Sequence, residues 1–183
     1  MDMDLGHKLE EAVRACGAFK AECIPAEKIV LSAKFREACK TNSCGHFGRC
    51  YQCPPDIGEI SELMERVRAY PYAVLYQSVA QIEDSFDYEG MMDAAQAHVQ
   101  LSQCVQKKVK TMLPEGFLHL SNGCSLCKRC AKEDNLPCRH PLEALPSMSG
   151  FGVDVYNTAA GTDLHYINGQ NTVTYFGMVL FVE

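Results

Sequence analysis

The sequence predicts an α+β fold, in which helices pack on a small, mostly antiparallel sheet and two cysteine-rich metal-binding loops are attached. Three observations support this prediction. Apolar residues recur at helical spacing in several segments, short aliphatic and aromatic runs between them are typical of strands, and most cysteines fall in two stretches. At 183 residues the chain can bury a core without cross-links. We expect a single domain over 1–183, with cysteine loops at 39–55 and 124–141.

The N-terminal segment predicts a helix followed by a strand. Asp4 can cap the helix, whose apolar stripe comprises Leu5, Leu9, Val13 and Cys16. Cys16 is therefore expected to face a core. Residues 28–32 are a short aliphatic run, which indicates a buried strand that leads into the first cysteine-rich stretch.

The middle of the chain predicts two further helices and two strands. Asp56 followed by Glu59 has the pattern of a capping box, which would open a helix that ends near Pro71. Residues 72–82 alternate as in a strand. A long helix is expected over about 88–113, and 116–121 is the next strand, which delivers the chain into the second cysteine-rich stretch.

The C-terminal part predicts a short helix beyond Pro141, a helical piece near 153–161 and a last strand over 172–182. Four polar residues surround the second of these helices: Asp154, Asn157, Asp163 and His165. A capped helix followed by a turn explains them, because polar residues and glycine are typical of such turns. The alternative interpretation is a substrate pocket.

Composition excludes several classes of function. A formal net charge of -6 argues against a nucleic-acid partner, and the run from Lys107 to Lys110 is typical of a solvated helix face. No stretch has the roughly 18 apolar residues that cross a bilayer, and Met1–Gly6 lacks the features of a secretory signal. We expect a cytoplasmic protein with no membrane partner, whose 11 cysteines stay reduced and serve as metal ligands or redox groups.

The second cysteine-rich stretch has the spacing of an iron–sulfur site. Cys124, Cys127 and Cys130 are each two residues apart, and Cys138 follows shortly before Pro141. Three cysteines at this spacing can surround one face of a cuboidal cluster while a distant fourth closes the site, as in bacterial ferredoxins. Structural zinc sites more often use two separated pairs. The spacing favours a [4Fe-4S] cluster, with zinc or metal-free thiols as alternatives.

The first cysteine-rich stretch contains Cys39, Cys44, Cys50 and Cys53. Their spacing matches no single standard pattern, although the glycines around His46 allow the loop to wrap closely around a centre. We favour a second [4Fe-4S] cluster, and zinc is the alternative. In two-cluster ferredoxins a cysteine of one run serves the other centre, so Cys53 and Cys138 can exchange if the loops meet.

Other residues are assigned secondary roles. Cys16 and Cys104 are most simply small buried hydrophobes, and Cys23 is a reserve ligand. His46 and His140 are expected to hydrogen-bond near the centres, with iron ligation as the alternative. Three cations flank the second stretch, where they would raise a cluster's potential or guide an acidic partner: Lys128, Arg129 and Arg139.

Several of these motifs resemble a bacterial and archaeal family of predicted metal-binding proteins, the domain-of-unknown-function 2284 family. The resemblance rests on Cys44 to Pro55 with its Cys-Pro-Pro ending, on Cys124 to Pro141, on Pro146-Ser147-Met148 and on Gly152-Val153-Asp154-Val155. It covers most of the chain and implies metal binding. An aromatic residue often precedes the Cys-Pro-Pro element of this family, whereas here Tyr51 lies two positions before Cys53.

The leading functional hypothesis is an iron–sulfur protein with two [4Fe-4S] clusters that transfers electrons or acts as a redox accessory protein, with a redox protein as partner. No nucleotide-binding glycine motif, P-loop, nucleophile elbow or H-E-x-x-H motif occurs in the sequence. One alternative is an enzyme that uses an open-site cluster on a small substrate. The other is a zinc-stabilised interaction module, in which the metal contributes only folding energy.

Overall fold

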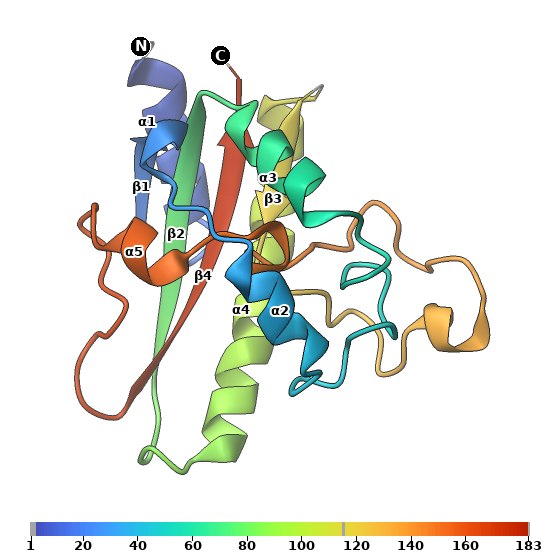
Figure 1. The fold of residues 1–183 in the computed structure, drawn as a ribbon. Coiled ribbons are helices and arrows are strands. Elements are labelled where there is room, and N and C mark those ends of the chain that lie inside the picture. The colour runs from blue at the N-terminus through green and yellow to red at the C-terminus, as the bar shows by residue number, and fades with distance from the viewer. Residues whose placement is uncertain (1–2, 115, 183) are drawn as a thin grey trace.

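A four-stranded antiparallel sheet forms the centre of the protein (Figure 1). The computed structural model describes residues 3–114 and 116–182. The strands lie in the order β1-β2-β4-β3. Their bounds are Lys20–Pro25 for β1, Tyr72–Gln81 for β2, Phe117–Leu120 for β3 and Thr172–Phe181 for β4. The α+β class with an antiparallel sheet is confirmed.

The two central strands are longer than their outer neighbours. β2 and β4 pair over their whole length, from Tyr72 opposite Phe181 to Gln81 opposite Thr172. β3 pairs only with the Met178–Phe181 end of β4. Beyond Leu120 the chain leaves the sheet, so the Thr172–Gly177 half of β4 lacks a β3 neighbour, and this is where the second cysteine-rich stretch departs.

Two helices cover one face of the sheet. These are α1 (Met3–Arg14) and α4 (Tyr88–Met112). The core on this face is built from helix and strand residues that alternate with the pleat: Leu9, Val13, Val74, Tyr76, Leu101, Val105, Val109, Val179 and Phe181. Asp87 caps α4 by accepting a hydrogen bond from the Gly90 amide at 2.8 Å, so the long helix begins close to its predicted residue.

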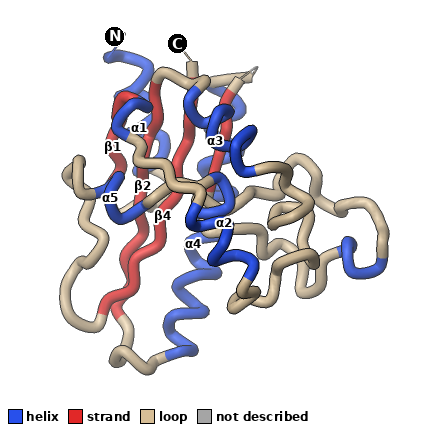
Figure 2. Tube along the Cα trace, in the orientation of Figure 1, coloured by secondary structure: helices blue, strands red, loops and turns tan. Residues whose placement is uncertain are grey.

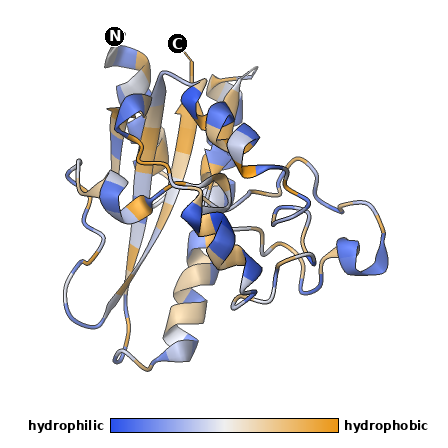
Figure 3. Ribbon diagram, in the orientation of Figure 1, coloured by the Kyte–Doolittle hydropathy of each residue, from blue (hydrophilic) through white to orange (hydrophobic). Residues whose placement is uncertain are grey.

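Shorter elements cover the opposite face, and the hydropathy colouring shows apolar strand positions beneath them (Figure 3). They are α2 (Lys34–Lys40), α3 (Ile60–Arg68), α5 (Val155–Ala159) and the 3-10 turns Ala26–Lys28 and Ser149–Phe151. Their core contains Leu63, Val67, Met148, Phe151 and Val153 against strand residues Leu75, Met178 and Leu180. The sheet is therefore enclosed between two layers.

Three predicted local features are wrong. Residues 28–32 form no strand: only Leu31 makes an isolated bridge, to Val153, and the N-terminal strand lies earlier. Residues 141–143 form a turn in place of the predicted short helix. Glu59 is the N-cap of α3 without a side-chain capping bond, because the Asp56 carboxylate pairs with Lys132 instead of capping a helix.

Cys16 and Cys104 form a disulfide, which corrects their assignment as buried thiols. Cys16 follows the end of α1, and Cys104 lies on α4. Since the two helices pack together, the Cα atoms lie 5.7 Å apart, within the usual range for a disulfide. In the described part of the chain, no helix is both long and apolar enough to cross a bilayer.

Candidate metal centre

The two cysteine loops lie side by side and project from one side of the sheet (Figure 1). The first cysteine loop, residues 39–55, begins in the last turn of α2, and the second, residues 124–141, follows β3. Both are mainly irregular chain, and the second contains one 3-10 turn, Ala131–Asp134 (Figure 2). Irregular backbone is suited to placing several side chains around one point.

The loops meet through their cysteine side chains. Cys50 of the first loop and Cys124 of the second line one cavity and interact with each other, and Cys50 also interacts with Cys53. The Cys124 contact lowers the pKa of the Cys50 thiol, but the Cys53 contact and burial outweigh it and raise that pKa to about 12. For Cys124, the contact with Cys50 raises the pKa, and burial adds to this effect. Cys50 is thus placed at the junction of the two quartets.

The remaining cysteines of the first loop surround Cys53. Hydrogen bonding from Cys50 lowers the pKa of Cys53, whereas burial and the nearby Cys44 and Cys39 oppose that shift. Cys44 also acts electrostatically on Cys39. Each of the other three predicted ligands of the first loop thus interacts with Cys53, and the condition for sharing ligands, that the two loops meet, is satisfied at Cys50.

A cavity of about 250 Å³ lies between the two loops. Five cysteines line it: Cys50, Cys124, Cys127, Cys130 and Cys138. His46 and His140 also line it. The backbone amide of His140 donates to the Cys138 sulfur at 3.4 Å. The predicted second quartet is brought together here, with one cysteine from the first.

Ion pairs and a hydrogen bond connect the two loops. Arg49 of the first loop donates to Glu133 of the second at 2.7 Å, and Lys132 pairs with Asp56 at 2.5 Å. The Tyr51 hydroxyl donates to the carbonyl of Leu136 at 2.8 Å. Lys132 also lies over the Tyr51 ring, 5.4 Å from its centroid. These contacts hold the two cysteine quartets in a fixed relation.

Glycine conformations allow the first loop to turn sharply. Gly45 and Gly48 have φ values of 76° and 69°, in the left-handed region that side chains disfavour. The Gly48 amide donates to the Pro54 carbonyl at 2.8 Å, which closes the loop over the preceding cysteines. Both glycines thus have the backbone conformation that a tight loop needs, and wrapping around a metal centre stays a prediction.

Arg36 is a buried cation beside the first quartet. Its side chain is on α2, one turn before Cys39, and its residue is 8% exposed. One guanidinium nitrogen donates to the Gly150 carbonyl at 3.1 Å, while Nε has no hydrogen-bond partner among the described residues. Burial raises the pKa of Cys39, and the positive charge of Arg36 opposes that rise. A buried guanidinium favours negative charge next to it.

The residues present fit a thiolate-bound metal group. Four thiolates around zinc or around a cubane cluster leave a net negative charge, which Arg36 can neutralise at the first quartet. The cysteines of the second quartet line a cavity of about 250 Å³. This cavity is larger than a single zinc ion with zinc–sulfur bonds of about 2.3 Å requires. In the described residues, no three His, Cys, Asp or Glu side chains already converge as they do around a single ion.

Comparison with known families agrees with the chemistry of these loops. The model of a family described as predicted metal-binding protein, domain of unknown function 2284, matches residues 22–181. The chain belongs to this family. No curated protein and no solved structure matches it. The family match extends from β1 to the end of β4 and so includes both cysteine loops of this predicted metal-binding protein.

The sequence analysis missed Arg36 and the ion pairs and hydrogen bond that join the two loops. Arg36 has the spacing signal of a residue one helical turn before Cys39, but its burial depends on the Gly150 turn that packs on α2. Of the cations flanking the second loop, Arg129 forms ion pairs with Asp134 at 2.9 Å and with Glu133 at 3.5 Å.

Asp154 caps α5 by accepting a hydrogen bond from the Asn157 backbone amide at 3.0 Å, which confirms the capped-helix interpretation.

Proposed function

We propose that this protein binds two [4Fe-4S] clusters and transfers electrons, acting with a redox protein partner. The proposed ligands are the two quartets: Cys39, Cys44, Cys50 and Cys53, and Cys124, Cys127, Cys130 and Cys138. An iron–sulfur cluster supplies one-electron oxidation and reduction at a potential set by charge, hydrogen bonds and exposure. The family match supports metal binding, and the nature of the metal is our proposal.

The observation that carries this proposal is the position of Cys50 from the first quartet in the wall of the cavity that the second quartet, including Cys124, lines. It joins a quartet with ferredoxin-like spacing to a second quartet that precedes it in the sequence. Because Cys50 and Cys124 line the same cavity, centres held by the two quartets would be neighbours. Adjacent redox centres are the arrangement that an electron-relay protein needs, whereas a structural zinc module needs no such proximity.

The residues around the quartets would raise the reduction potential of such centres. Arg36 places a buried positive charge beside Cys39, and the His140 amide points at the Cys138 sulfur. Positive charge and N–H···S hydrogen bonds both stabilise the more negative, reduced form of a cluster. We therefore expect Arg36→Gln to lower the reduction potential of the first centre, with little effect on the second.

The test is to purify the full chain without oxygen and to count its metals. We expect about eight iron and eight sulfide per chain, a broad brown absorption and a paramagnetic signal after reduction. Stoichiometric zinc without colour would overturn electron transfer and leave the zinc-stabilised module. One cluster only, with about four iron, would overturn the assignment of the first quartet.

Matched cysteine variants assign the ligands. Cys127→Ser should lower the iron content by about half, whereas Cys23→Ser, on β1 outside both loops, should leave it unchanged. If Cys127→Ser keeps all its iron and Cys23→Ser loses it, the proposed ligand set is wrong. Retention of a full cluster by a serine variant within a quartet would instead favour an enzyme with an open iron site.

A further inference from the structure

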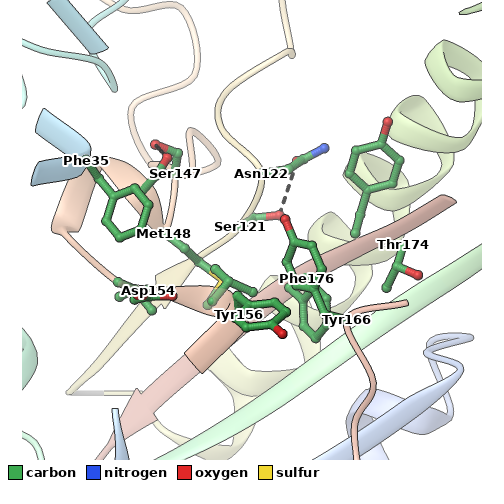
Figure 4. Close-up of a pocket in the computed structure, with 14 residues that line it drawn as sticks. Phe35, Ser121, Asn122, Ser147, Met148, Asp154, Tyr156, Tyr166, Thr174 and Phe176 are labelled. Atoms are coloured by element: carbon green, nitrogen blue, oxygen red, sulfur yellow. Dashed lines mark hydrogen bonds between the residues drawn. The ribbon is translucent and has the colours of Figure 1, made fainter. Parts of the chain in front are cut away.

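A second cavity lies on the sheet face opposite α4, away from the sulfur-lined one. Its volume is about 290 Å³, and it lies between α2, the 147–156 segment and the half of β4 that lacks a β3 neighbour (Figure 4). Ligand cavities commonly start at about 300 Å³, so this one suits a small molecule. We call it the aromatic cavity.

Aromatic rings form its walls. Phe35 lies on one side, and Tyr156, Tyr166 and Phe176 are grouped on the other (Figure 4). Tyr166 stacks on Phe176 with centroids 5.8 Å apart and planes 14° apart, and Tyr156 meets Tyr166 edge-on at 5.5 Å. The two tyrosines are nevertheless 59% and 49% exposed, so ring surface that is held in place remains accessible.

The charge of the cavity is negative. Asp154 lines it, and its carboxylate is fixed by hydrogen bonds from the backbone and side-chain amides of Asn157 at 3.0 and 2.7 Å. The donor groups of Asn157 are uncharged, so they do not neutralise the Asp154 carboxylate. None of the described residues that line the cavity is Lys, Arg or His. Such a lining disfavours phosphate- or carboxylate-bearing ligands and favours cations, which aromatic faces also attract.

The cavity is connected to both cysteine loops by short segments. Phe35 in its wall lies four residues before Cys39 on α2, and Asn122 lies two residues before Cys124. Ser121 also lines it and follows β3 directly. A ligand in the aromatic cavity would therefore contact the two segments that enter the two quartets.

We propose that the aromatic cavity is a binding site for a small organic cation, of the quaternary or methylated ammonium class. The cationic head lies against the faces of Tyr156, Tyr166 and Phe35, and Asp154 provides the counter-charge. This assignment goes beyond electron transfer and does not depend on which metal the cysteines hold, because every residue that carries it lies outside the quartets.

The test compares two probes of nearly the same shape on the anaerobically purified full chain. Choline carries a trimethylammonium group, and 3,3-dimethylbutan-1-ol replaces its nitrogen by carbon and is neutral. Saturation-transfer nuclear magnetic resonance on the methyl protons, followed by calorimetric titration, gives both affinities. We expect choline to bind about tenfold more tightly, the difference typical of a cation–π site. Equal affinity, or no binding of either probe, would overturn the proposal.

Two variants and one control locate the site. Asp154→Asn removes the charge but keeps a side chain that caps α5 well, so choline should bind several times more weakly while the neutral probe is unaffected. Tyr166→Leu should weaken choline about tenfold. Phe86→Leu removes a ring that is 90% exposed outside the cavity and should change neither affinity.

Either of two results would place the binding elsewhere. The first is an Asp154→Asn protein that binds choline like the parent chain, and the second is a Phe86→Leu protein that loses choline binding. Thermal unfolding of each variant shows whether it is folded. If Tyr166→Leu fails to fold, Asp154→Asn alone decides the outcome, because Asn can still accept the capping hydrogen bond from the Asn157 backbone amide.

Discussion

The ring of Tyr76 lies directly over Gly177. The two residues are partners in the register of β2 and β4, and a Cβ atom at position 177 would collide with the Tyr76 ring and hydroxyl. Because Gly177 has no side chain, Tyr76 can cross the central strand and reach His119 on β3, at 2.8 Å from Oη to Nε2. A glycine in the middle of the sheet thus permits a buried hydrogen bond between strands that are not neighbours.

We assign the direction of this hydrogen-bond chain from its far end. Gln106 directs its amide nitrogen to the Leu142 carbonyl at 3.5 Å, so its oxygen accepts from His119 Nδ1 at 2.8 Å. Nε2 of the neutral imidazole must then accept from Tyr76. The Tyr76 oxygen is left to accept from Ser102 at 2.9 Å, and Ser102 bonds Ser121 at 2.7 Å.

We expect Gly177→Ala to destabilise the protein by about 2–4 kcal/mol. The added methyl group must displace the Tyr76 ring, which combines overpacking with the loss of a buried hydrogen bond. Equilibrium denaturation measures the change. Gly116→Ala is the control, since a Cβ there meets nothing within 4 Å. A Gly177→Ala protein as stable as this control would show that the ring can move without cost.

Two buried imidazoles should make the protein acid-sensitive. Burial lowers the pKa of His98 to about 4 and that of His119 to about 3, whereas both side chains titrate near 6.5 when unfolded. Below pH 6.5 the unfolded state binds more protons, so stability falls as the pH decreases towards 4. Each ring contributes a slope of about 1.4 kcal/mol per pH unit in that range.

Ring nitrogen chemical shifts test this expectation without unfolding the protein. At pH 5 both His98 and His119 should be neutral, and His119 should carry its proton on Nδ1, as its bond to Gln106 requires. An imidazolium signal from either residue at pH 5 would contradict the burial argument. A neutral His119 protonated on Nε2 would instead reverse the hydrogen-bond chain through Tyr76.

The sequence predicts elements well where the local pattern of apolar residues is strong. β4 is an apolar run whose residues face two cores, and α4 has both a helical stripe and a cap at Asp87. β1 escapes prediction because Lys20, Glu22 and Pro25 belong to an edge strand that pairs on one side only. The predicted capping box fails because the Asp56 carboxylate pairs with a residue distant in the sequence, which no local pattern reveals.

The candidate site is likewise predictable only where a local sequence pattern determines it. Spacing alone groups Cys124, Cys127, Cys130 and Cys138, which the structure places around one cavity. The contact of Cys50 with Cys124 and the burial of Arg36 depend on how the two loops and the Gly150 turn pack. These are tertiary relations, and a single sequence contains no local signal for them.

We expect loss of the disulfide to affect stability and to leave the metal centre intact. The double variant Cys16→Ser, Cys104→Ser removes a cross-link between residues 88 positions apart and should lower the free energy of unfolding by about 2–4 kcal/mol. Denaturation of the parent and variant gives this value, and mass analysis after thiol alkylation shows whether the bond is present. A loss of metal in this variant would contradict the separation of the two groups of cysteines.

The ion pair between Asp56 and Lys132 should control how firmly metal is held. Lys132 in the second loop and Asp56, directly after the first, are only 22% and 23% exposed, so Lys132→Glu places two carboxylates opposite each other. The loops should separate, and a chelator should remove metal about tenfold faster, as for other residues that support metal ligands. Adding Asp56→Lys to this variant restores an ion pair with the two charges exchanged, so the chelator should again remove the metal almost as slowly as from the parent protein.

The matched control for this charge reversal is Glu65→Gln, which breaks the exposed Glu65–Arg68 pair within α3. Since that pair joins no two segments, its loss should leave metal release unchanged. Equal rates for Lys132→Glu and Glu65→Gln would show that the cysteines alone hold the loops together. Failure of the double variant to recover would show that the contact of Lys132 with the Tyr51 ring, which the reversal also removes, contributes more than the ion pair.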